Sequence, residues 1–271
     1  MADGALVLVG TPIGNLGDLS PRAVEALAAA DAICCEDTRR TGRLLQHAGV
    51  ERKGALVVVN EHTEARETDA VLARLARGER VAVVSDAGMP GISDPGERLV
   101  QAAVAAGHAV EVVPGPSAAL AALVASGLPT GRFVFEGFLP RKGSGRSERL
   151  AAVAAERRTV VVYEAPHRLA RTLSDLAAAC GDERPVAVAR ELTKLHEEVW
   201  RGSLGDALAW VRAAAPKGEI VLVLEGAPAP GPPDDGALVD ALRDELAAGA
   251  TARDAARAVA ARLGVPRRRV Y

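Results

Sequence analysis

The chain has 271 residues, 49% of them apolar and 25% charged, which is the usual balance of a globular protein with one or two domains. Its net charge of −2 excludes a global basic field that would attract nucleic acid, so a basic surface would have to be local. Cys34 and Cys35 lie in an apolar run and are expected to be buried thiols, and no cysteine, Cys180 included, has the spacing of a metal site. Because a signal-peptide pattern and long apolar stretches are missing, we expect a cytoplasmic protein.

The first 116 residues alternate short β-branched runs with helical patterns. Residues 5–10 are almost continuously apolar, which is typical of a strand buried on both faces of a parallel sheet, and Ser20-Pro21 then begins a helix. Further strands are expected at residues 32–35, 56–59, 81–84 and 110–113, and helices at residues 38–47, 64–76 and 97–106. This order predicts a mostly parallel sheet with helices on its faces.

Residues 117–226 are expected to form a second α/β domain. Strands are expected at residues 132–137, 159–163, 186–190, 198–201 and 219–224, and helices at residues 148–157, 168–179 and 203–214. The third and fourth of these strands follow each other too closely for a helix between them, so a hairpin is expected and the second sheet should be mixed. The predicted fold class is therefore α/β, with two α/β domains, 1–116 and 117–226.

The end of the chain follows a linker. Residues 227–236 (APAPGPPDDG) are rich in proline and glycine and have no periodicity. Residues 237–271 are expected to form a small helical tail with helices at 238–248 and 252–263, the second one beginning with a capping-box-like pair, Thr251 and Asp254. The tail ends with a basic run at 267–269, so a nucleic-acid-binding protein without catalytic activity is one interpretation of this region.

The loop at residues 85–96, Ser-Asp-Ala-Gly-Met-Pro-Gly-Ile-Ser-Asp-Pro-Gly, is the strongest candidate for a ligand site. It follows a buried strand, and its glycines and prolines make a stiff turn with exposed backbone groups at the end where α/β sheets bind ligands. Asp94-Pro95 is also expected to cap the next helix. A cap requires one aspartate and does not require the Gly88–Gly91 turn, so the pattern favours a function.

Two other loops follow predicted strands, and the one at residues 114–118 is expected beside the loop at 85–96. Residues 10–18 (GTPIGNLGD), with the acids Glu36 and Asp37 further on, resemble a nicotinamide fingerprint, but the glycine spacing is wrong and Pro12 removes a backbone donor. A tight turn is therefore the simpler interpretation. Residues 114–118 (PGPSA) leave the next strand, and Ser117 is expected to cap a helix. Because neither candidate loop at the expected cleft is basic, the pattern favours a small neutral or cationic ligand over a polyphosphate.

The second domain adds titratable groups at strand ends. Residues 163–168 (YEAPHR) and 190–198 offer acids, an imidazole and arginine forks, although solvated strand ends would have the same composition. Local basic stretches occur at residues 39–43, 132–149 and 267–269. The glycine-containing segment at 139–146 is either a contact for a phosphate backbone or a solvated loop.

These segments together resemble the tetrapyrrole (corrin/porphyrin) methylase superfamily and, within it, the bacterial small-subunit rRNA (cytidine-2′-O)-methyltransferases. The resemblance extends over residues 5–226 and rests on residues 9–18, 36–39, 85–96, 114–118, 135–141, 163–168, 190–194 and 217–219. It implies S-adenosylmethionine in a cleft between two α/β domains, a homodimer, and methyl transfer to the ribose 2′-hydroxyl of a decoding-centre cytidine in 16S rRNA. No metal is implied. The tail resembles the small C-terminal domain of that family but stops where another helix would be expected.

The resemblance also implies roles for particular residues. The cofactor-binding residues would be Pro12, Asp86, Gly88, Gly91, Ile92, Ser93, Asp94, Ser117, Ala118 and Leu192. The RNA-binding residues would be Arg39, Arg40, Arg141, Lys142, Arg146, His167 and Arg168.

The proton of the 2′-hydroxyl needs an acceptor, for which Glu164, Asp37 and Lys194 are the catalytic candidates. Lys194 would need a pKa depressed by burial or by Arg190. A methylase of a small tetrapyrrole precursor remains the alternative, since it would share the fold and the cofactor.

Overall fold

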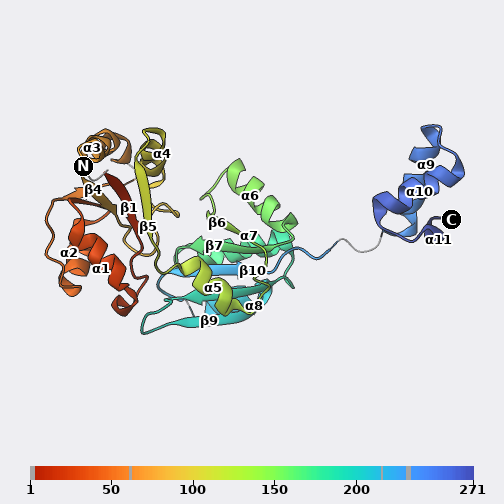
Figure 1. Cartoon of the computed structure of the whole chain (residues 1–271). Coiled ribbons are helices and arrows are strands. Elements are labelled where there is room, and N and C mark those ends of the chain that lie inside the picture. Colours follow the sequence, from red (N-terminus) through yellow and green to blue (C-terminus); the bar gives the residue numbers. More distant parts are fainter. Residues whose placement is uncertain (1–3, 61–62, 215, 230–232) are drawn as a thin grey trace. The chain divides into compact units, whose positions relative to one another are not determined.

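The computed structural model describes residues 4–60, 63–214, 216–229 and 233–271. The chain divides into two units, Met1–Ala227 and Pro228–Tyr271 (Figure 1). The first unit contains both predicted sheets. Part of the predicted linker, residues 230–232, and the first three residues lie outside the described residues.

The first sheet is parallel throughout, as the alternating pattern predicts. Its order is β3-β2-β4-β1-β5, formed by β1 (Ala5–Val9), β2 (Ala32–Cys35), β3 (Leu56–Val58), β4 (Arg80–Val83) and β5 (Ala109–Val113). Its connections contain the 3₁₀ helix η1 (Leu16–Asp18) and the helices α1 (Pro21–Ala29), α2 (Thr38–His47), α3 (Glu64–Ala76) and α4 (Glu97–Ala105). Leu27 of α1 and Leu45 of α2 belong to one apolar cluster with the sheet, and Leu75 of α3 and Leu99 of α4 belong to another. The sheet is thus covered on both faces, which explains its apolar strands.

The second sheet is mixed, as predicted. Its order is β6-β7-β10-β8-β9, formed by β6 (Phe133–Phe138), β7 (Thr159–Glu164), β8 (Pro185–Arg190), β9 (Glu198–Ser203) and β10 (Ile220–Leu224). The predicted hairpin is the antiparallel pair β8–β9, and β10 runs antiparallel to both β7 and β8. Helix α5 (Ala118–Ser126) belongs to one apolar cluster with this sheet, and α6 (Ser144–Ala155), α7 (Leu169–Cys180) and α8 (Leu204–Ala214) belong to the other.

The N-termini of four helices can be compared with the N-cap residues that the sequence predicts. Ser20 accepts a hydrogen bond from the N–H of Ala23, and Thr251 accepts one from Asp254, so both of these caps are confirmed. The predicted cap at Asp94 is wrong, because α4 begins at Glu97 and Gly96 is its N-cap residue. Ser117 does occupy the N-cap position of α5, but its side chain makes no capping hydrogen bond.

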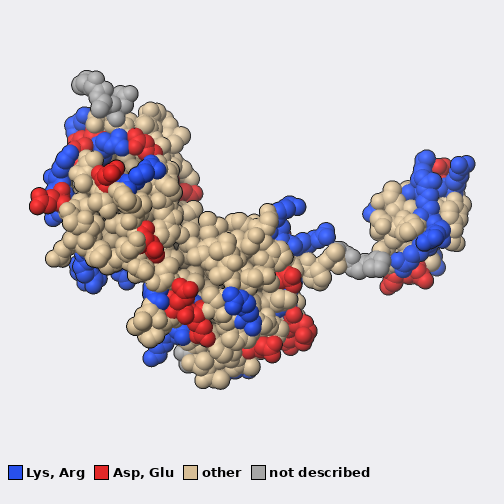
Figure 2. Space-filling model, turned by 60° about the horizontal axis from the view of Figure 1, so that its bottom comes forward, with Lys and Arg blue, Asp and Glu red and all other residues tan. Residues whose placement is uncertain are grey.

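The second unit is helical and has its own small core. It contains the predicted helices as α9 (Asp235–Ala247) and α10 (Ala252–Leu263), and also a short α11 (Arg267–Val270). Leu238, Val259 and Val270, one from each helix, are buried together. Figure 2 shows arginine side chains gathered along one side of this unit, which contains no lysine. Among the described residues, every helix is too short or too polar to cross a membrane.

Candidate active site

Three glycine- and proline-rich loops meet because β4, β1 and β5 are neighbours in the first sheet. The N–H of Gly10 donates to the carbonyl of Val113 at 2.9 Å, and the N–H of Thr11 donates to Gly88 at 2.9 Å. A Cβ atom on Gly10 would lie 2.6 Å from the Cα of Gly115, so the loops after β1 and β5 touch through bare backbone. The loops that the sequence predicts to be neighbours are therefore in contact.

The loop at 85–96 has a conformation that depends on glycine. Gly88, Gly91 and Gly96 have φ angles of 85°, 81° and 128°, in the region that side chains disfavour. Ser93 adopts a φ of 61° without being glycine, which is a local strain typical of binding sites. The loop therefore depends on its three glycines for its shape.

The second sheet brings three segments to the same edge. Because β10 is antiparallel to its neighbours, its first residue, Ile220, pairs with Glu164 at the end of β7 and with Arg190 at the end of β8. Glu219, just before β10, therefore lies beside the turn that follows β8. In that turn Thr193 accepts a hydrogen bond from the N–H of Asn15 at 3.0 Å, which connects the two α/β lobes.

Two adjoining cavities lie where the lobes meet. The first, of about 340 Å³, is lined by Ile13, Glu36, Arg40, Asp86, Ala87, Gly88, Met89, Ile92, Ser93, Asp94, Ser117, Ala118, Phe138, Tyr163, Glu164, Ala165, Pro166, Leu192, Glu219, Ile220 and Val221. The second, of about 470 Å³, is lined by Thr11, Pro12, Ile13, Gly14, Leu16, Arg40, Thr41, Arg43, Leu44, Ser85, Asp86, Ala87, Lys194 and Glu219. They share a wall made of Ile13, Arg40, Asp86, Ala87 and Glu219.

Most of the predicted cofactor residues line the first cavity. They are Asp86, Gly88, Ile92, Ser93, Asp94, Ser117, Ala118 and Leu192. Pro12 lines the second cavity instead, and Gly91 lines neither. Ile13, Met89, Tyr163 and Glu219 are wall residues that the prediction missed, and for Glu219 the reason is the antiparallel direction of β10, which the sequence pattern does not reveal.

The first cavity is rich in carboxylates. Burial raises the pKa of Glu36, although its side chain accepts a hydrogen bond from the N–H of Asp86 at 3.0 Å. Burial also raises the pKa of Asp86, whose Oδ2 lies 3.4 Å from Arg40, while its buried Oδ1 has no hydrogen-bond partner. Burial, followed by the negative charge of Glu36, raises the pKa of Asp94 to about 7. A bound cation would stabilise the ionised form of these groups.

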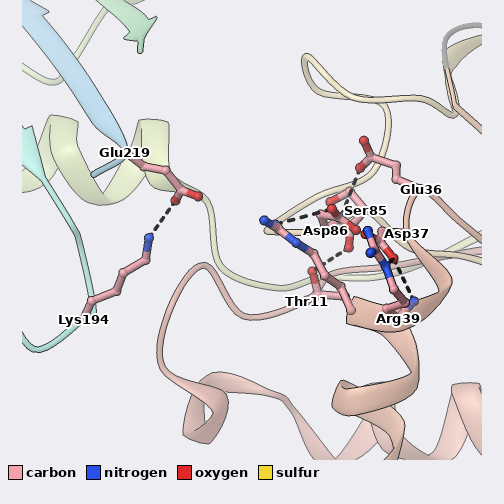
Figure 3. A network of polar contacts seen from close by, with 9 residues as sticks. Thr11, Glu36, Asp37, Arg39, Ser85, Asp86, Lys194 and Glu219 are labelled. Carbon is pink, nitrogen blue, oxygen red and sulfur yellow. Dashed lines mark hydrogen bonds and ion pairs between the residues drawn. The ribbon is translucent and has the colours of Figure 1, made fainter. Parts of the chain in front are cut away.

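Figure 3 shows how this network is arranged, with Glu219 and Lys194 facing Asp86 and its neighbours from the other lobe. Lys194 Nζ lies 3.0 Å from Glu191 and 3.1 Å from Glu219. These two partners outweigh the effect of burial and raise the pKa of Lys194. A lysine that acts as a base requires a depressed pKa, and the prediction of such a pKa is wrong for Lys194. Its side chain therefore carries a positive charge.

The other two catalytic candidates are held by internal contacts. Glu164 is buried, with one oxygen 3.1 Å from Arg168 and the other accepting a hydrogen bond from Thr172. Asp37 is the N-cap of α2, and its hydrogen bonds with Arg39 hold its pKa well below the usual range. Their catalytic roles stay predictions, and in this structure both carboxylates are engaged in contacts within the protein.

The predicted RNA-binding residues differ in exposure. Arg39, Arg141, Lys142 and His167 are exposed. Arg146 has little exposed surface, because its side chain is 5% exposed and its guanidinium is paired with Asp175 at 2.7 Å, so its RNA contact stays a prediction. Arg168 is largely buried as well, since it donates to the carbonyl of Leu139 at 2.6 Å.

A parallel α/β lobe and a mixed one, with glycine loops and two cavities at their junction, define an α/β enzyme of the two-lobed methylase type. Residues 5–208 match the tetrapyrrole (corrin/porphyrin) methylases, and the chain belongs to this family. It is 48% identical over 270 residues to "Ribosomal RNA small subunit methyltransferase I" of Synechocystis sp., covering 99% of this chain and 96% of the relative. The Mycobacterium bovis protein of that name is 46% identical over 272 residues, covering 100% and 94%.

Solved structures agree with the family. The methyltransferase CobJ superposes with a TM-score of 0.63 at 25% identity, covering 84% of this chain and 96% of that one. Uroporphyrin-III-C-methyltransferase from Thermus thermophilus gives a TM-score of 0.58 at 26% identity, covering 81% and 94%.

The residues of the first cavity fit the cofactor that methylases use. S-adenosylmethionine carries a positive sulfonium, an amino group and an adenine ring. The carboxylates Asp86 and Asp94, one with an unpartnered oxygen, suit the cationic groups, and apolar side chains such as Ile92 and Leu192 suit the ring. Among the described residues, no group of three or more His, Cys, Asp or Glu side chains could hold a metal ion.

Proposed function

We propose that the chain is an S-adenosylmethionine-dependent methyltransferase that methylates the ribose 2′-hydroxyl of a decoding-centre cytidine in 16S rRNA, acting on the small ribosomal subunit in the cytoplasm. The observation that carries this proposal is the pair of adjoining cavities. The first suits a small cation with an apolar ring. The second is lined by Arg40, Arg43 and Lys194, which suit a sugar-phosphate chain. The names of relatives at 46% and 48% identity support the choice of rRNA.

The shared wall is the place where the two ligands would meet. When bound, S-adenosylmethionine supplies a methyl group on a positively charged sulfur. Transfer of this methyl group to the ribose oxygen would leave S-adenosylhomocysteine and release the hydroxyl proton, which must pass to an acceptor in the protein. The lobes' main contribution is to hold the ribose oxygen in line with the methyl group.

Asp86 is the acceptor that the geometry favours. It belongs to both cavities, its Oδ1 has no hydrogen-bond partner, and its raised pKa makes it a better proton acceptor than an ordinary carboxylate. Arg40 and Lys194 would then act as fixed positive charges near the RNA. This assignment differs from the candidates that the sequence suggests.

One experiment separates the main proposal from its rivals. Purified protein is incubated with tritiated cofactor and 30S subunits that lack the modification, with uroporphyrinogen as a competing substrate. We expect label in 2′-O-methylcytidine after nuclease digestion of the 16S rRNA. Label in the porphyrin alone would identify a tetrapyrrole methylase, and 30S binding without label would favour the non-enzyme interpretation. A chain cut after Ala227 should keep cofactor binding, since residues 1–227 form a unit of their own.

We also propose that two copies of the chain form a homodimer, which is the assembly that the resemblance to the rRNA methyltransferases implies. Helix α5 supports it, because its sequence AALAALVAS is apolar up to its last residue, Ser126, although only one side is buried. Leu120 and Val124, four residues apart, are 51% and 72% exposed. A second copy would cover this face, and light scattering should give twice the mass of the 28.0 kDa chain.

A further inference from the structure

A third hollow, apart from the two cavities, is lined mainly by basic side chains. It lies at the start of α7, has a volume of about 240 Å³, and is lined by Arg141, Arg146, His167, Arg168, Arg171 and Thr172. No carboxylate is among these lining residues. Its charge is therefore opposite to that of the cofactor cavity.

Two of its arginines form a fixed floor. Arg146 is 4% exposed and donates to Asp175 at 2.8 Å and to the carbonyl of Pro140 at 2.8 Å. Arg168 donates to Leu139 and lies 3.1 Å from Glu164. Because these guanidinium groups already have partners within the protein, they shape the hollow and hold it rigid.

The rim carries positive charge that the protein does not neutralise. Arg141 and His167 are exposed, and neither has an ion pair or side-chain hydrogen bond within the described parts of the chain. Arg171 is 3.8 Å from Asp175, a carboxylate that the closer Arg146 also uses. Four guanidinium groups thus face two carboxylates, Glu164 and Asp175, so the hollow has an excess of positive charge.

The backbone adds to this field. Helix α7 has 12 residues, and its N-cap residue Arg168 makes no capping hydrogen bond with its side chain. The first N–H groups of a helix and its dipole both favour an anion at this end. Arginine forks on the rim match the paired oxygens of a phosphate group.

We propose that this hollow binds a phosphate of the RNA backbone, away from the reacting nucleotide, with Arg141 and Arg171 as the direct contacts. The inference rests on the proposed function for its choice of polyanion. The lining consists mainly of arginines and contains no Phe, Tyr or Trp ring, which favours contact with the RNA backbone over recognition of the base sequence. Its role is to hold the subunit while the cleft acts on one nucleotide.

The test is a double variant, Arg141→Ala with Arg171→Ala, which leaves the floor intact. The control is Arg22→Ala, an exposed arginine on α1. Filter binding to 30S subunits between 50 and 200 mM salt should give a log–log slope that is smaller by about 0.7–0.9 for the double variant, as the loss of one phosphate contact requires. The KM for 30S subunits should rise, whereas the cofactor Kd should stay unchanged, because neither arginine lines the cofactor cavity. A slope equal to that of the control would overturn the inference.

A second measurement tests the hollow independently of whether the chain methylates 30S subunits. Binding of a short single-stranded RNA and of inorganic phosphate is measured for the wild type and for the double variant. Loss of RNA binding in the double variant supports the hollow even if 30S subunits are not methylated. A loss confined to inorganic phosphate would mean that the hollow holds only a free anion and would contradict the RNA contact.

Discussion

Glu64 Oε1 accepts a hydrogen bond from the N–H of Gly96 at 3.0 Å, across 32 positions of sequence. It also accepts from Arg98 at 3.1 Å and Leu99 at 3.3 Å, so a carboxylate on α3 caps the start of α4. The loop at 85–96 ends at this cap. Its shape is thus held by a residue of another helix, and not by its own aspartate.

Replacing Glu64 by Ala should loosen the end of the cofactor loop. The N–H groups would lose their acceptor in a site that is 7% exposed, so we expect the free energy of unfolding to fall by about 1–2 kcal/mol. Urea unfolding measures this change, and calorimetry should show weaker binding of S-adenosylmethionine. Glu67→Ala on the same helix, whose ion pair with Arg66 is at the surface, is the control and should change stability by less than about 1 kcal/mol. Equal effects of the two variants would contradict the capping role.

Replacing Gly115 by Ala tests the close approach of two loops. Its Cβ would lie 2.7 Å from the Cα of Gly10, which is backbone and cannot move aside easily. We expect loss of cofactor affinity of at least tenfold together with a lower unfolding midpoint. Gly42→Ala is the control, because nothing lies within 4 Å of its new Cβ and it should stabilise α2 by roughly 1 kcal/mol. If Gly115→Ala bound the cofactor normally, the tight contact would be unimportant.

Replacing Asp86 by Asn should slow the chemical step by more than it weakens cofactor binding. We expect turnover on 30S subunits at saturating cofactor to fall by roughly 10²–10⁴, the usual contribution of a proton acceptor, and the cofactor Kd to rise by less, because Asp86 also faces the cationic groups of the cofactor. Single-turnover methylation measures the rate, and calorimetry measures the binding. Glu164→Gln is the informative comparison, since Glu164 is held by Thr172 and Arg168 and should affect stability more than rate. If Glu164→Gln had wild-type stability but methylated more slowly than Asp86→Asn, Glu164 and not Asp86 would be the proton acceptor.

Asp94 should make the unliganded protein sensitive to pH. Its pKa of about 7 lies above its ordinary value of 3.8, so the folded state binds more protons than the unfolded state between these two values. Stability is therefore expected to decrease as the pH rises from about 4 to 7, and Asp94→Asn should remove part of that slope. Thermal unfolding at a series of pH values measures it.

Cofactor binding should have the opposite dependence. Ionised Asp94 attracts a sulfonium or an ammonium group, so affinity should increase as the pH rises through about 7. Calorimetry at pH 5.5 and 8.5 should show this gain in the wild type and a smaller one in Asp94→Asn. An identical gain in both proteins would assign the effect to Glu36 or Asp86, whose pKa values burial also raises.

The sequence by itself determined the local features of this protein. Apolar runs such as residues 5–10 predict buried parallel strands, and the turn residues of 85–96 and 114–118 predict a ligand site at their ends. Ser20 and Thr251 predict helix starts that the structure confirms. These features depend on hydrophobic period and backbone geometry, which short stretches of sequence encode directly.

Only the tertiary structure decided which side chains are free to act. The sequence suggests that Arg146 is a surface cation, but the fold buries it against Asp175. The sequence also suggests Lys194 as a base, but Glu191 and Glu219 keep its side chain charged. The antiparallel direction of β10 brings Glu219 to the wall that it shares with Asp86. Ion pairs, burial and strand direction arise from residues far apart in the chain, so no local pattern contains them.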